Sequence, residues 1–404
     1  MNRPASGHPR HKPHVNIATL GPAGHGKTTL TAALTHVLGT RARALSAPPA
    51  GPGPGPGPGS GPGRGPGESA PRATVACVHV AYETGTRHYA HTDPPGRPRF
   101  TKNLLAGTAR LDGAVFVVSA VDGPAARASG HLLLARRAGV RHLVVALTKA
   151  DEAGPELTDL VEQDVRALLT AHGYDGEHTA VVRVSALCAL RGDPRWTATI
   201  EALLDAVDTY VPTPLRYTDA PFLLSVDRVL TVPARGTAVT GVIERGTVRL
   251  RDHVRLLGHE GPCDTHITGL ESFGRPLTEA RAGDRVSLLL RGLHREHAHR
   301  GDTVAAPGSV VPRRRFTADV RLLRADEGGR HTPLFSGYRP QFHLRTADVP
   351  GTVILGGLGV ALPGETVTMS VVLDRELPLE TGLAVVIREG GRTVGTGTVS
   401  PAVP

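Results

Sequence analysis

The feature that most constrains this chain is a glycine-rich turn between an apolar strand and a helix near the N-terminus. Residues 14–20 form a β-branched run that predicts a buried strand, and residues 29–38 have the apolar period of a helix. The turn between them reads Gly21-x4-Gly26-Lys27-Thr28, which is the spacing of a phosphate-binding loop. In such a loop, backbone N–H groups surround the phosphates, the lysine reaches the β- and γ-phosphates, and the threonine hydroxyl binds Mg²⁺.

The turn therefore predicts a nucleotide site, against the alternative of a glycine-rich strand–helix connection that binds no ligand. Lys27 is also a catalytic candidate, because its ammonium would face the transferred phosphate. We expect every residue of the loop to contribute to nucleotide binding: Gly21, Pro22, Ala23, Gly24, His25, Gly26, Lys27 and Thr28.

The rest of the first half of the chain alternates strand-like and helix-like segments. This alternation is typical of a mostly parallel sheet with helices on both faces. The expected strands are 75–84, 114–122, 142–151 and 180–186, and the expected helices are 125–138, 156–171 and 197–209. After Pro214 the pattern changes to short apolar runs separated by Gly, Asp and Pro, as in β-barrels. These runs are 222–230, 237–246, 253–258 and 285–292.

The predicted fold class is thus an α/β domain with a mostly parallel sheet, followed by two all-β barrel domains. Residues 47–67 are nearly all Gly and Pro, cannot bury apolar surface, and are predicted to be a mobile loop. The expected boundaries are a flexible segment 1–13, a nucleotide-binding domain 14–211, and barrel domains 212–307 and 308–404.

Composition narrows the setting in which the protein works. Cys77, Cys188 and Cys263 lie far apart without a CxxC pair, which excludes a disulfide framework or a cysteine-based zinc site. No stretch is apolar over the roughly 18 residues that a membrane helix needs, and no signal peptide follows the basic N-terminus. We therefore expect a soluble, cytoplasmic protein. The net charge of +9 is consistent with a polyanionic partner. Only four of the 46 basic residues are lysine, so an arginine-rich coding background could also explain the excess of positive charge.

A second motif, Asp93-Pro94-Pro95-Gly96, has the form DxxG. In a protein with a phosphate-binding loop, such an aspartate can hold Mg²⁺ through water, and the glycine N–H can sense the γ-phosphate. Taken alone, the four residues are equally typical of a turn.

Two further segments follow apolar strands and suit a guanine base. In Thr148-Lys149-Ala150-Asp151, the carboxylate can accept hydrogen bonds from N1–H and N2–H₂ of guanine, and the lysine stem can cover the base. In Ser185-Ala186-Leu187, a backbone N–H can reach the guanine O6. A solvated strand end is the alternative for the first segment alone, but the four elements in this order favour GTP over ATP.

Two other features carry little functional signal. His294, His297 and His299 could suggest a metal site, but Arg and Glu flank them, so a solvated charged loop is the better interpretation. The single tryptophan, Trp196, is interpreted as a packing residue.

Several stretches resemble the bacterial elongation factor Tu family, from about residue 12 to residue 399 and across all three predicted domains. They are KPHVNIATLG, HGKTTLTAALT, YETGTRHYAHTDPPG, LDGAVFVVSAVDGP, RGTAVTGVIERGTV, GGRHTPLFSGYRPQF and IREGGRTVGTG. The resemblance implies a monomeric translational GTPase that uses GTP and Mg²⁺ and carries aminoacyl-tRNA to the ribosome. It further implies a nucleotide-exchange factor, Ts, and release of the factor after hydrolysis to GDP.

Position by position, the resemblance also implies roles for individual residues. It adds Thr74, the switch threonine that closes over Mg²⁺ and the γ-phosphate, to the metal-site candidates Thr28 and Asp93. The implied tRNA-binding residues are Lys102 and Asn103 near the 5′ end, Glu271 at the pocket for the terminal adenosine, and Arg300 and Arg330 at the acceptor and T stems.

Departures from the family pattern affect catalysis and tRNA binding more than nucleotide binding. The family histidine that positions the attacking water is Arg97 here, so the catalytic candidates are Arg97, Gly96 and Lys27. The tract 47–67 replaces a loop with a short helix before the switch threonine. The other departures are Gly24 for an aspartate, Thr148 for an asparagine, Arg285 for an asparagine beside the adenosine pocket, and Pro350 for a T-stem threonine.

We predict a specialised paralogue that binds GTP and Mg²⁺ and retains aminoacyl-tRNA delivery with altered hydrolysis. The alternative is a GTP-binding regulatory protein that engages tRNA or translation components without efficient turnover. A further hypothesis is resistance to elfamycin antibiotics, which bind this family between its first and third domains. There Arg127 and Val386 stand where the family has a glutamine and an alanine, although arginine-rich drift would also produce such changes.

Overall fold

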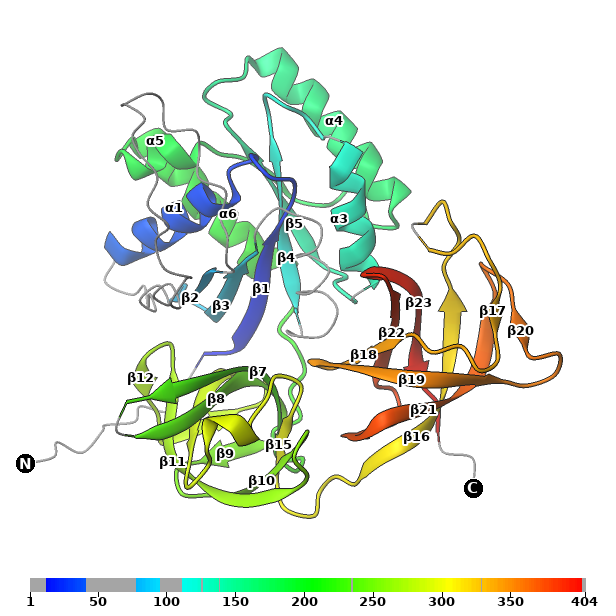
Figure 1. Ribbon diagram of the computed structural model, residues 1–404. Coiled ribbons are helices and arrows are strands. Elements are labelled where there is room, and N and C mark those ends of the chain that lie inside the picture. The colour runs from blue at the N-terminus through cyan, green and yellow to red at the C-terminus, as the bar shows by residue number, and fades with distance from the viewer. Residues whose placement is uncertain are drawn as a thin grey trace, which may run out of the picture. The chain divides into compact units, whose positions relative to one another are not determined.

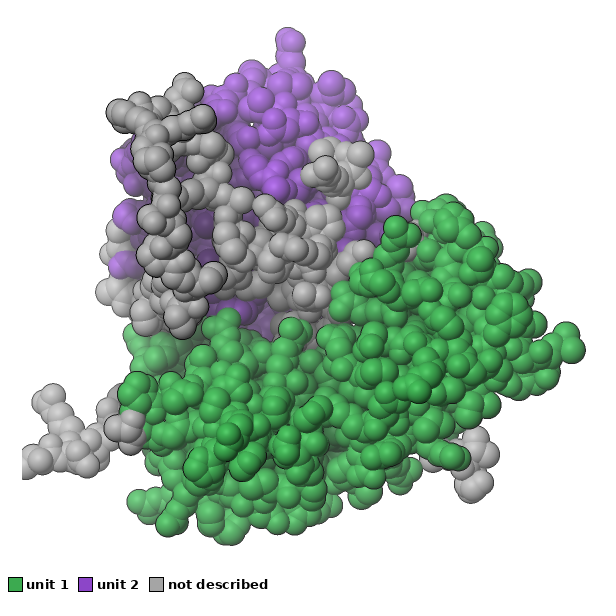
Figure 2. All heavy atoms as spheres, viewed as in Figure 1, with its two compact units in different colours: residues 1–9, 103–110, 215–404 green, residues 10–102, 111–214 purple. Residues whose placement is uncertain are grey.

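The computed structural model describes most of the chain and shows two compact units (Figure 2). One unit holds the described residues up to 214, and the other holds those from 215 onward. The predicted flexible segment 1–13, apart from its last two residues, and the predicted mobile loop 47–67 lie outside the described ranges. These ranges are 12–40, 78–94, 111–124, 126–137, 139–233, 235–327 and 329–401.

The first unit is built on a six-stranded sheet (Figure 1). In spatial order its strands are β2 (Val78–Glu83), β3 (His88–Asp93), β1 (His14–Leu20), β4 (Gly113–Ser119), β5 (Leu143–Thr148) and β6 (Val181–Arg183). Neighbouring strands run parallel except β2 and β3, which form an antiparallel pair at one edge. Every residue of β4 and β5 is buried, as expected for central strands covered on both faces.

Helices cover both faces of this sheet (Figure 1). They are α1 (Lys27–Thr40), α3 (Ala126–Arg137), α4 (Pro155–Ala171), α5 (Ala186–Leu190) and α6 (Pro194–Tyr210). On one face, α1, α5 and α6 share a core with β1, β4 and β5 through side chains such as Leu34, Ile200 and Val117. Helices α3 and α4 lie on the other face. The connections that follow the parallel strands therefore gather at their carboxyl edge, where ligands of such sheets bind.

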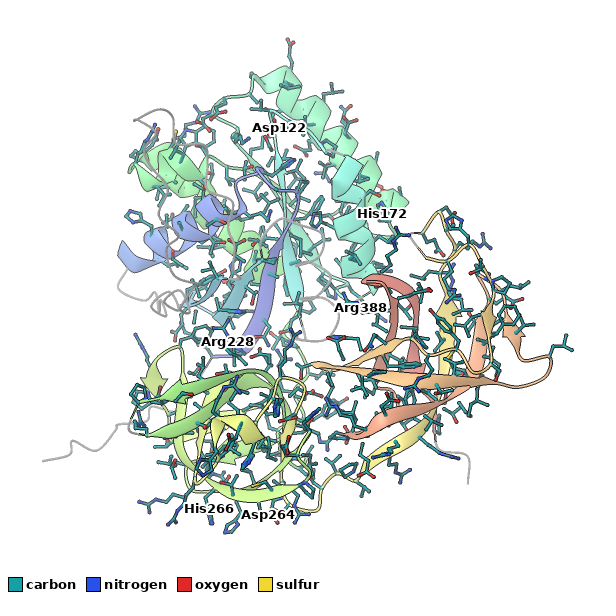
Figure 3. All side chains as sticks on the ribbon, in the orientation of Figure 1. Asp122, His172, Arg228, Asp264, His266 and Arg388 are labelled. Carbon is teal, nitrogen blue, oxygen red and sulfur yellow. The ribbon has the colours of Figure 1, made fainter. Side chains whose placement is uncertain are left out.

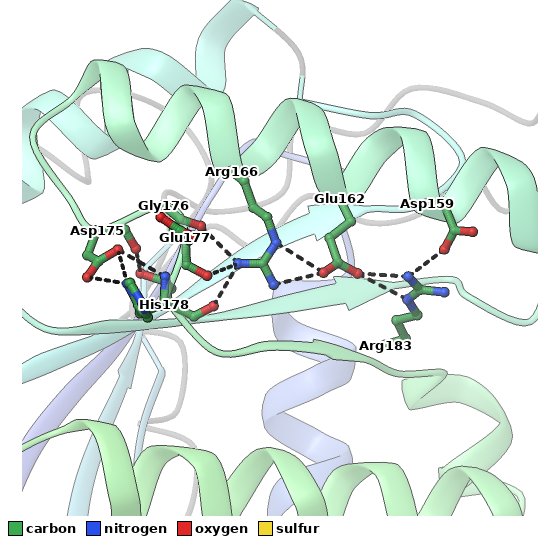
Figure 4. A network of polar contacts seen from close by, with 9 residues as sticks. Asp159, Glu162, Arg166, Asp175, Gly176, Glu177, His178 and Arg183 are labelled. Carbon is green, nitrogen blue, oxygen red and sulfur yellow. Dashed lines mark hydrogen bonds and ion pairs between the residues drawn. The ribbon is translucent and has the colours of Figure 1, made fainter.

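A row of ion pairs holds α4 to the strand beside it (Figure 4). Glu162 accepts hydrogen bonds from Arg166 of the same helix and from Arg183 of β6, each at 2.8 Å. Arg183 also pairs with Asp159 at 2.6 Å. Arg166 donates in turn to the carbonyl oxygen of Gly176 at 2.8 Å. The network thus joins α4, β6 and the turn between them.

The second unit begins with a sheet that closes on itself. Its strands in spatial order are β10 (His253–Leu257), β15 (Thr303–Ala305), β7 (Leu223–Val232), β8 (Gly236–Arg245), β14 (Arg285–Leu290), β11 (Cys263–Ser272) and β12 (Arg275–Pro276). Because β10 also pairs with β11, the two ends of the sheet meet around a core that includes Leu288 and Val239. A ribbon of β9 (Thr247–Arg249) and β13 (Glu279–Arg281) and a 3₁₀ turn, η2 (Arg295–His297), complete this barrel.

The remaining strands form a second closed barrel. Their order is β16 (Pro312–Leu322), β21 (Thr366–Pro378), β19 (Ala347–Leu355), β18 (Gln341–Leu344), β22 (Ala384–Glu389) and β23 (Arg392–Val399). A small ribbon pairs β17 (Leu334–Phe335) with β20 (Val360–Ala361). The barrel interior is a separate apolar core around Phe342 and Val371.

The structure confirms the fold class predicted from the sequence, and the domain boundaries stay predictions. Strand β3 was missed because four of its six residues, His88, His91, Thr92 and Asp93, are polar although buried. Helix α6 begins before the predicted residue 197, because the Asp193 side chain caps it and a proline occupies its first turn. The five-residue helix α5 was also missed, since it is too short to show a period.

Two smaller predictions concern side chains with little functional signal. Trp196 packs against the core of the α/β unit, as predicted. His294 and His297 are exposed at η2, as expected for a solvated loop, whereas His299 is half-buried. None of the described helices combines the length and apolarity needed to cross a membrane.

Candidate nucleotide-binding site

The turn from β1 to α1 has the backbone conformation of a phosphate-binding loop. Gly21, Gly24 and Gly26 have φ angles of 141°, 87° and 81°, which residues with a Cβ rarely adopt. At Gly21, a Cβ would also lie 2.3 Å from the carbonyl oxygen of Val117 in β4. Glycine at these positions lets the chain turn tightly onto the amino end of α1, where N–H groups and the helix dipole attract anions.

Lys27, the first residue of α1, lies inside this turn with 6% of its surface exposed. Its Nζ donates a hydrogen bond to the carbonyl oxygen of Pro22 at 2.7 Å. Burial lowers the pKa of the ammonium to about 8, against the opposing influence of Asp93. A phosphate bound in the turn would place a negative charge beside the buried ammonium and stabilise it. Lys27 is therefore positioned to bind a phosphate.

Asp93, the last residue of β3 and the first of the DxxG motif, lies beside the loop. Its Oδ2 accepts a hydrogen bond from Thr28 Oγ1 at 2.8 Å, and its Oδ1 accepts one from Thr19 Oγ1 at 2.6 Å. Burial raises the pKa of Asp93, against the hydrogen bonds from both threonines. A threonine hydroxyl and a carboxylate this close are hard oxygen donors, so these residues fit Mg²⁺.

His25 anchors the loop to strands β4 and β5. Its Nδ1 accepts a hydrogen bond from the backbone N–H of Ser119 at 3.0 Å, and its carbonyl oxygen accepts one from Thr148 Oγ1 at 2.8 Å. Burial lowers the pKa of His25. Because Nδ1 is an acceptor here, the neutral ring is assigned its proton on Nε2. The phosphate loop and the end of β5 are thus directly connected.

The segment after β5 leaves the strand through an unusual backbone conformation. Lys149 has a φ of 57°, which is uncommon for a residue with a side chain. Its ammonium pairs at 2.8 Å with Asp122. Asp122 follows β4 and is labelled in Figure 3. Conformations of this kind cost free energy and concentrate at functional sites. Here the turn sets the position of Asp151, two residues further on.

Asp151 is hydrogen-bonded by the connection between β6 and α5. Ser185 caps α5 by accepting a hydrogen bond from the Cys188 N–H at 3.2 Å, and the Cys188 thiol donates to Asp151 Oδ2 at 3.4 Å. Although burial acts to raise it, hydrogen bonds from Ser185 and Cys188 hold the pKa of Asp151 below its ordinary value. The carboxylate therefore stays ionised, which suits an acceptor for the N1–H and N2–H₂ edge of guanine.

The structure thus brings the phosphate loop, Asp93 with the buried Pro94, and the segments 148–151 and 185–187 to one edge of the sheet. Sequence reasoning missed Ser119, Asp122 and Cys188, which reach the site only through tertiary structure. Asp122 carried one usable signal, since it follows a buried strand just as Asp151 does. Six other predicted site residues lie outside the described ranges: Thr74, Pro95, Gly96, Arg97, Lys102 and Asn103.

The predicted adenosine-pocket residue lies on the first barrel. Glu271, in β11, pairs with Arg235 at 3.3 Å. Nearby in the same sheet, Arg285 of β14 pairs with Asp227 of β7 at 2.6 Å. These last two side chains are only 13% and 10% exposed, so a nearly buried ion pair occupies the position where the family has an asparagine.

The other predicted tRNA contacts are distributed over both barrels. Arg300 is exposed just after η2, and Pro350 lies in β19. Arg330 pairs with Glu389 at 3.0 Å, and its guanidinium lies 4.5 Å from the ring centre of Tyr338. Arg330 and Glu389 also line a surface hollow of 430 Å³ on the second barrel.

Taken together, the α/β unit offers a phosphate loop, oxygen donors for a divalent cation, and an ionised carboxylate for a guanine edge. These features define a GTP-binding protein of the phosphate-loop class.

Comparison with known proteins identifies the family within that class. Three protein-family models match the chain. The family model described as Elongation factor Tu GTP binding domain matches residues 12–213, the family model Elongation factor Tu domain 2 matches residues 236–305, and the family model Elongation factor Tu C-terminal domain matches residues 309–402. A relative named Elongation factor Tu 2, from Streptomyces avermitilis, is 58% identical over 397 residues, which cover 98% of this chain and 99% of the relative. The chain therefore belongs to the elongation factor Tu family of translational GTPases.

Proposed function

We propose that this GTPase delivers aminoacyl-tRNA to the ribosome as a monomeric, cytoplasmic complex with GTP and Mg²⁺, and that factor Ts reloads it with GTP. The family match over almost the whole chain supports this role. The single observation that carries the nucleotide part is the 2.8 Å contact between Thr28 and Asp93, which joins the phosphate loop to the DxxG motif.

In the proposed cycle, the described residues bind and orient the nucleotide. Lys27 would move from the Pro22 carbonyl to the β- and γ-phosphates, since a phosphate is the stronger partner for an ammonium. Thr28 and Asp93 would hold Mg²⁺, which when bound offsets the charge on the phosphates. Asp151 would accept two hydrogen bonds from guanine and so reject adenine.

We propose that hydrolysis on the ribosome is slow, because Arg97 stands where the family has a histidine. A guanidinium has donors only, so it cannot accept a proton from the attacking water or orient that water through a lone pair. It can still stabilise negative charge that develops on the γ-phosphate.

The alternative is a GTP-binding regulatory protein without efficient turnover. The ion pair between Arg285 and Asp227 favours it, because a nearly buried pair beside Glu271 adds bulk and charge next to the proposed adenosine pocket. The tract 47–67 also favours it, since a Gly/Pro segment loses more conformational entropy on ordering than a helix-forming loop.

We also propose that the protein resists elfamycin antibiotics. Val386 is half-buried in β22, opposite His343 of β18, and adds two methyl groups relative to the family alanine. Arg127 lies in α3, and its side chain is outside the described part of the structure. If the purified protein bound kirromycin tightly, and an Arg127→Gln, Val386→Ala double variant bound it equally, the resistance proposal would be wrong.

Complementation separates elongation from the regulatory alternative. The chain is expressed in a strain depleted of its ordinary elongation factor, with Lys27→Ala as a matched variant whose phosphate-binding ammonium is missing. Elongation predicts that the parent chain supports growth and that the variant does not. Absence of growth, together with normal GDP binding by the purified parent chain, would favour the regulatory alternative.

A further inference from the structure

Two histidines stand directly opposite each other on the surface of the first barrel. They are His253 of β10 and His266 of β11, which are Cα partners in the antiparallel pairing of these strands. The backbone N–H of Ile267 donates to the carbonyl oxygen of Asp252 at 3.1 Å, so the next pair along, His253 and His266, is a non-hydrogen-bonded one. Side chains stand closest in pairs of this kind, and the two imidazole ring centroids lie 3.7 Å apart.

Both rings are available to a ligand. His253 is exposed and His266 is half-buried, and neither ring makes a hydrogen bond or an ion pair with a residue that the structure describes. Asp264, labelled with His266 in Figure 3, lies further along β11 on the same face and opposite Arg255. Its two carboxylate oxygens accept hydrogen bonds from the Arg255 guanidinium, each at 2.7 Å. The carboxylate therefore offsets a positive charge that would repel a cation bound at the two histidines.

Two imidazoles on neighbouring strands form a bidentate ligand for a divalent transition metal. Metal–nitrogen bonds are about 2.0–2.1 Å long, so two rings bound at a right angle on one ion have centroids about 4.5 Å apart, and two rings at a tetrahedral angle have centroids about 5.2 Å apart. Starting from 3.7 Å, the right-angled arrangement needs the smaller opening of the pair. That arrangement is typical of Cu²⁺ and Ni²⁺, and Cu²⁺ binds such ligands most tightly among the divalent first-row metals.

We propose that His253 and His266 bind one Cu²⁺ ion on the surface of the first barrel. Within the part of the chain that the structure describes, no group of three or more His, Cys, Asp or Glu is arranged to hold a metal, so water completes the coordination. The pairing of β10 with β11 joins the two ends of the barrel sheet, so the bound ion links the strands that close the barrel. The site is separate from the nucleotide site and does not depend on the proposed role in elongation.

The test titrates the full chain with Cu²⁺ supplied as its iminodiacetate complex, because the chelator keeps weak single-histidine sites empty. At about pH 7.5, where free imidazole is mostly neutral, we expect one equivalent to bind through two protein nitrogens, as counted by electron paramagnetic resonance. His253→Gln and His266→Gln should each raise the dissociation constant by about tenfold or more, since losing a ligand costs at least as much as losing a contact that orients one. His142→Gln, at an exposed histidine of the α/β unit, should leave it unchanged.

The proposal would be overturned if either single variant bound Cu²⁺ as tightly as the parent chain, or if the spectrum of the parent showed one protein nitrogen instead of two. Amide hydrogen exchange tests the link between the strands. Saturating Cu²⁺ should slow exchange across β10 and β11 in the parent chain and leave it unchanged in the double variant His253→Gln, His266→Gln. Equal exchange in the parent chain with and without the metal would refute the link.

Discussion

Asp151 is the side chain on which guanine selectivity rests in this account. Its carboxylate is kept ionised by Ser185 and Cys188 and is presented beyond the strained turn at Lys149. Asp151→Asn would place an amide N–H₂ opposite N1–H of guanine, so binding of GDP should weaken by about 2–3 kcal/mol, roughly 30- to 150-fold in Kd. Xanthine nucleotides, which carry an oxygen at that edge, should be tolerated better. Equal losses for both nucleotides in a binding titration would refute the role of Asp151.

Arg97 is the residue that most affects the proposed rate of hydrolysis. Restoring a lone pair with Arg97→His should raise ribosome-stimulated GTP turnover by on the order of 100-fold, the lower end of what a positioned acid–base group contributes. Affinity for GTP should change little, because Lys27, Thr28 and Asp151 are unaltered. Single-turnover GTP hydrolysis on programmed ribosomes is the measurement, and a parent chain as fast as an ordinary elongation factor would contradict the prediction.

His131 links the stability of the α/β unit to pH. It is buried in α3, and burial, aided by Lys27 and His25, lowers its pKa from 6.5 to about 4. Because the unfolded chain takes up a proton at a higher pH than the folded one, stability is full above pH 6.5 and falls as the pH drops toward 4. The loss from this group should approach about 3 kcal/mol.

Urea unfolding between pH 7 and pH 4 tests this linkage. His131→Leu cannot bind the proton, so the free energy of unfolding should fall less steeply with pH than in the parent chain. His142→Leu, at an exposed position, should leave the slope unchanged. The linkage would be refuted if His131→Leu and the parent chain lost stability in parallel.

At the scale of elements, α4 depends on the ion pairs that Glu162 makes with Arg166 and Arg183 (Figure 4). Glu162→Gln would leave both arginines without their carboxylate, at a site where Glu162 is only 20% exposed, and should cost about 1–2 kcal/mol of stability. Asp164→Asn, an equivalent change at an exposed position of the same helix, should cost less than about 0.5 kcal/mol. Urea unfolding of both variants measures the difference, and equal effects would show that the network contributes nothing.

Elements with a strong local signal could be predicted from the sequence. The strand at 14–20 and the helix after it follow from an apolar pattern interrupted by glycines, and the structure places β1 at the same residues. Strand β2 lies within the predicted strand 75–84, but its partner β3 could not be predicted, because the polar residues of β3 are buried by the sheet and not by their own chemistry. The start of α6 could have been predicted from Asp193-Pro194, because a capping residue followed by proline is typical of the first turn of a helix.

At the scale of the whole molecule, the α/β domain followed by two barrels could be predicted from the change of pattern after residue 214. The ion pairs that connect the two barrels could not, because they join residues far apart in the chain. Arg345 of the second barrel, only 8% exposed, pairs with Glu244 of the first at 3.1 Å, and Arg245 of the first barrel pairs with Glu380 of the second. The same holds for the candidate site. Its motifs could be predicted from the sequence, whereas the contacts of Asp122, Ser119 and Cys188 could not, because they form only through tertiary structure.

The central claim, that the chain is an elongation GTPase and not a passive GTP-binding protein, is tested most directly by GTP turnover on programmed ribosomes. Turnover is measured with and without cognate aminoacyl-tRNA, with Lys27→Ala as the control. The account predicts turnover that depends on both ribosomes and cognate tRNA, at a rate that Arg97→His increases. Turnover that ribosomes and aminoacyl-tRNA leave unchanged, in a protein that still binds GTP, would contradict it.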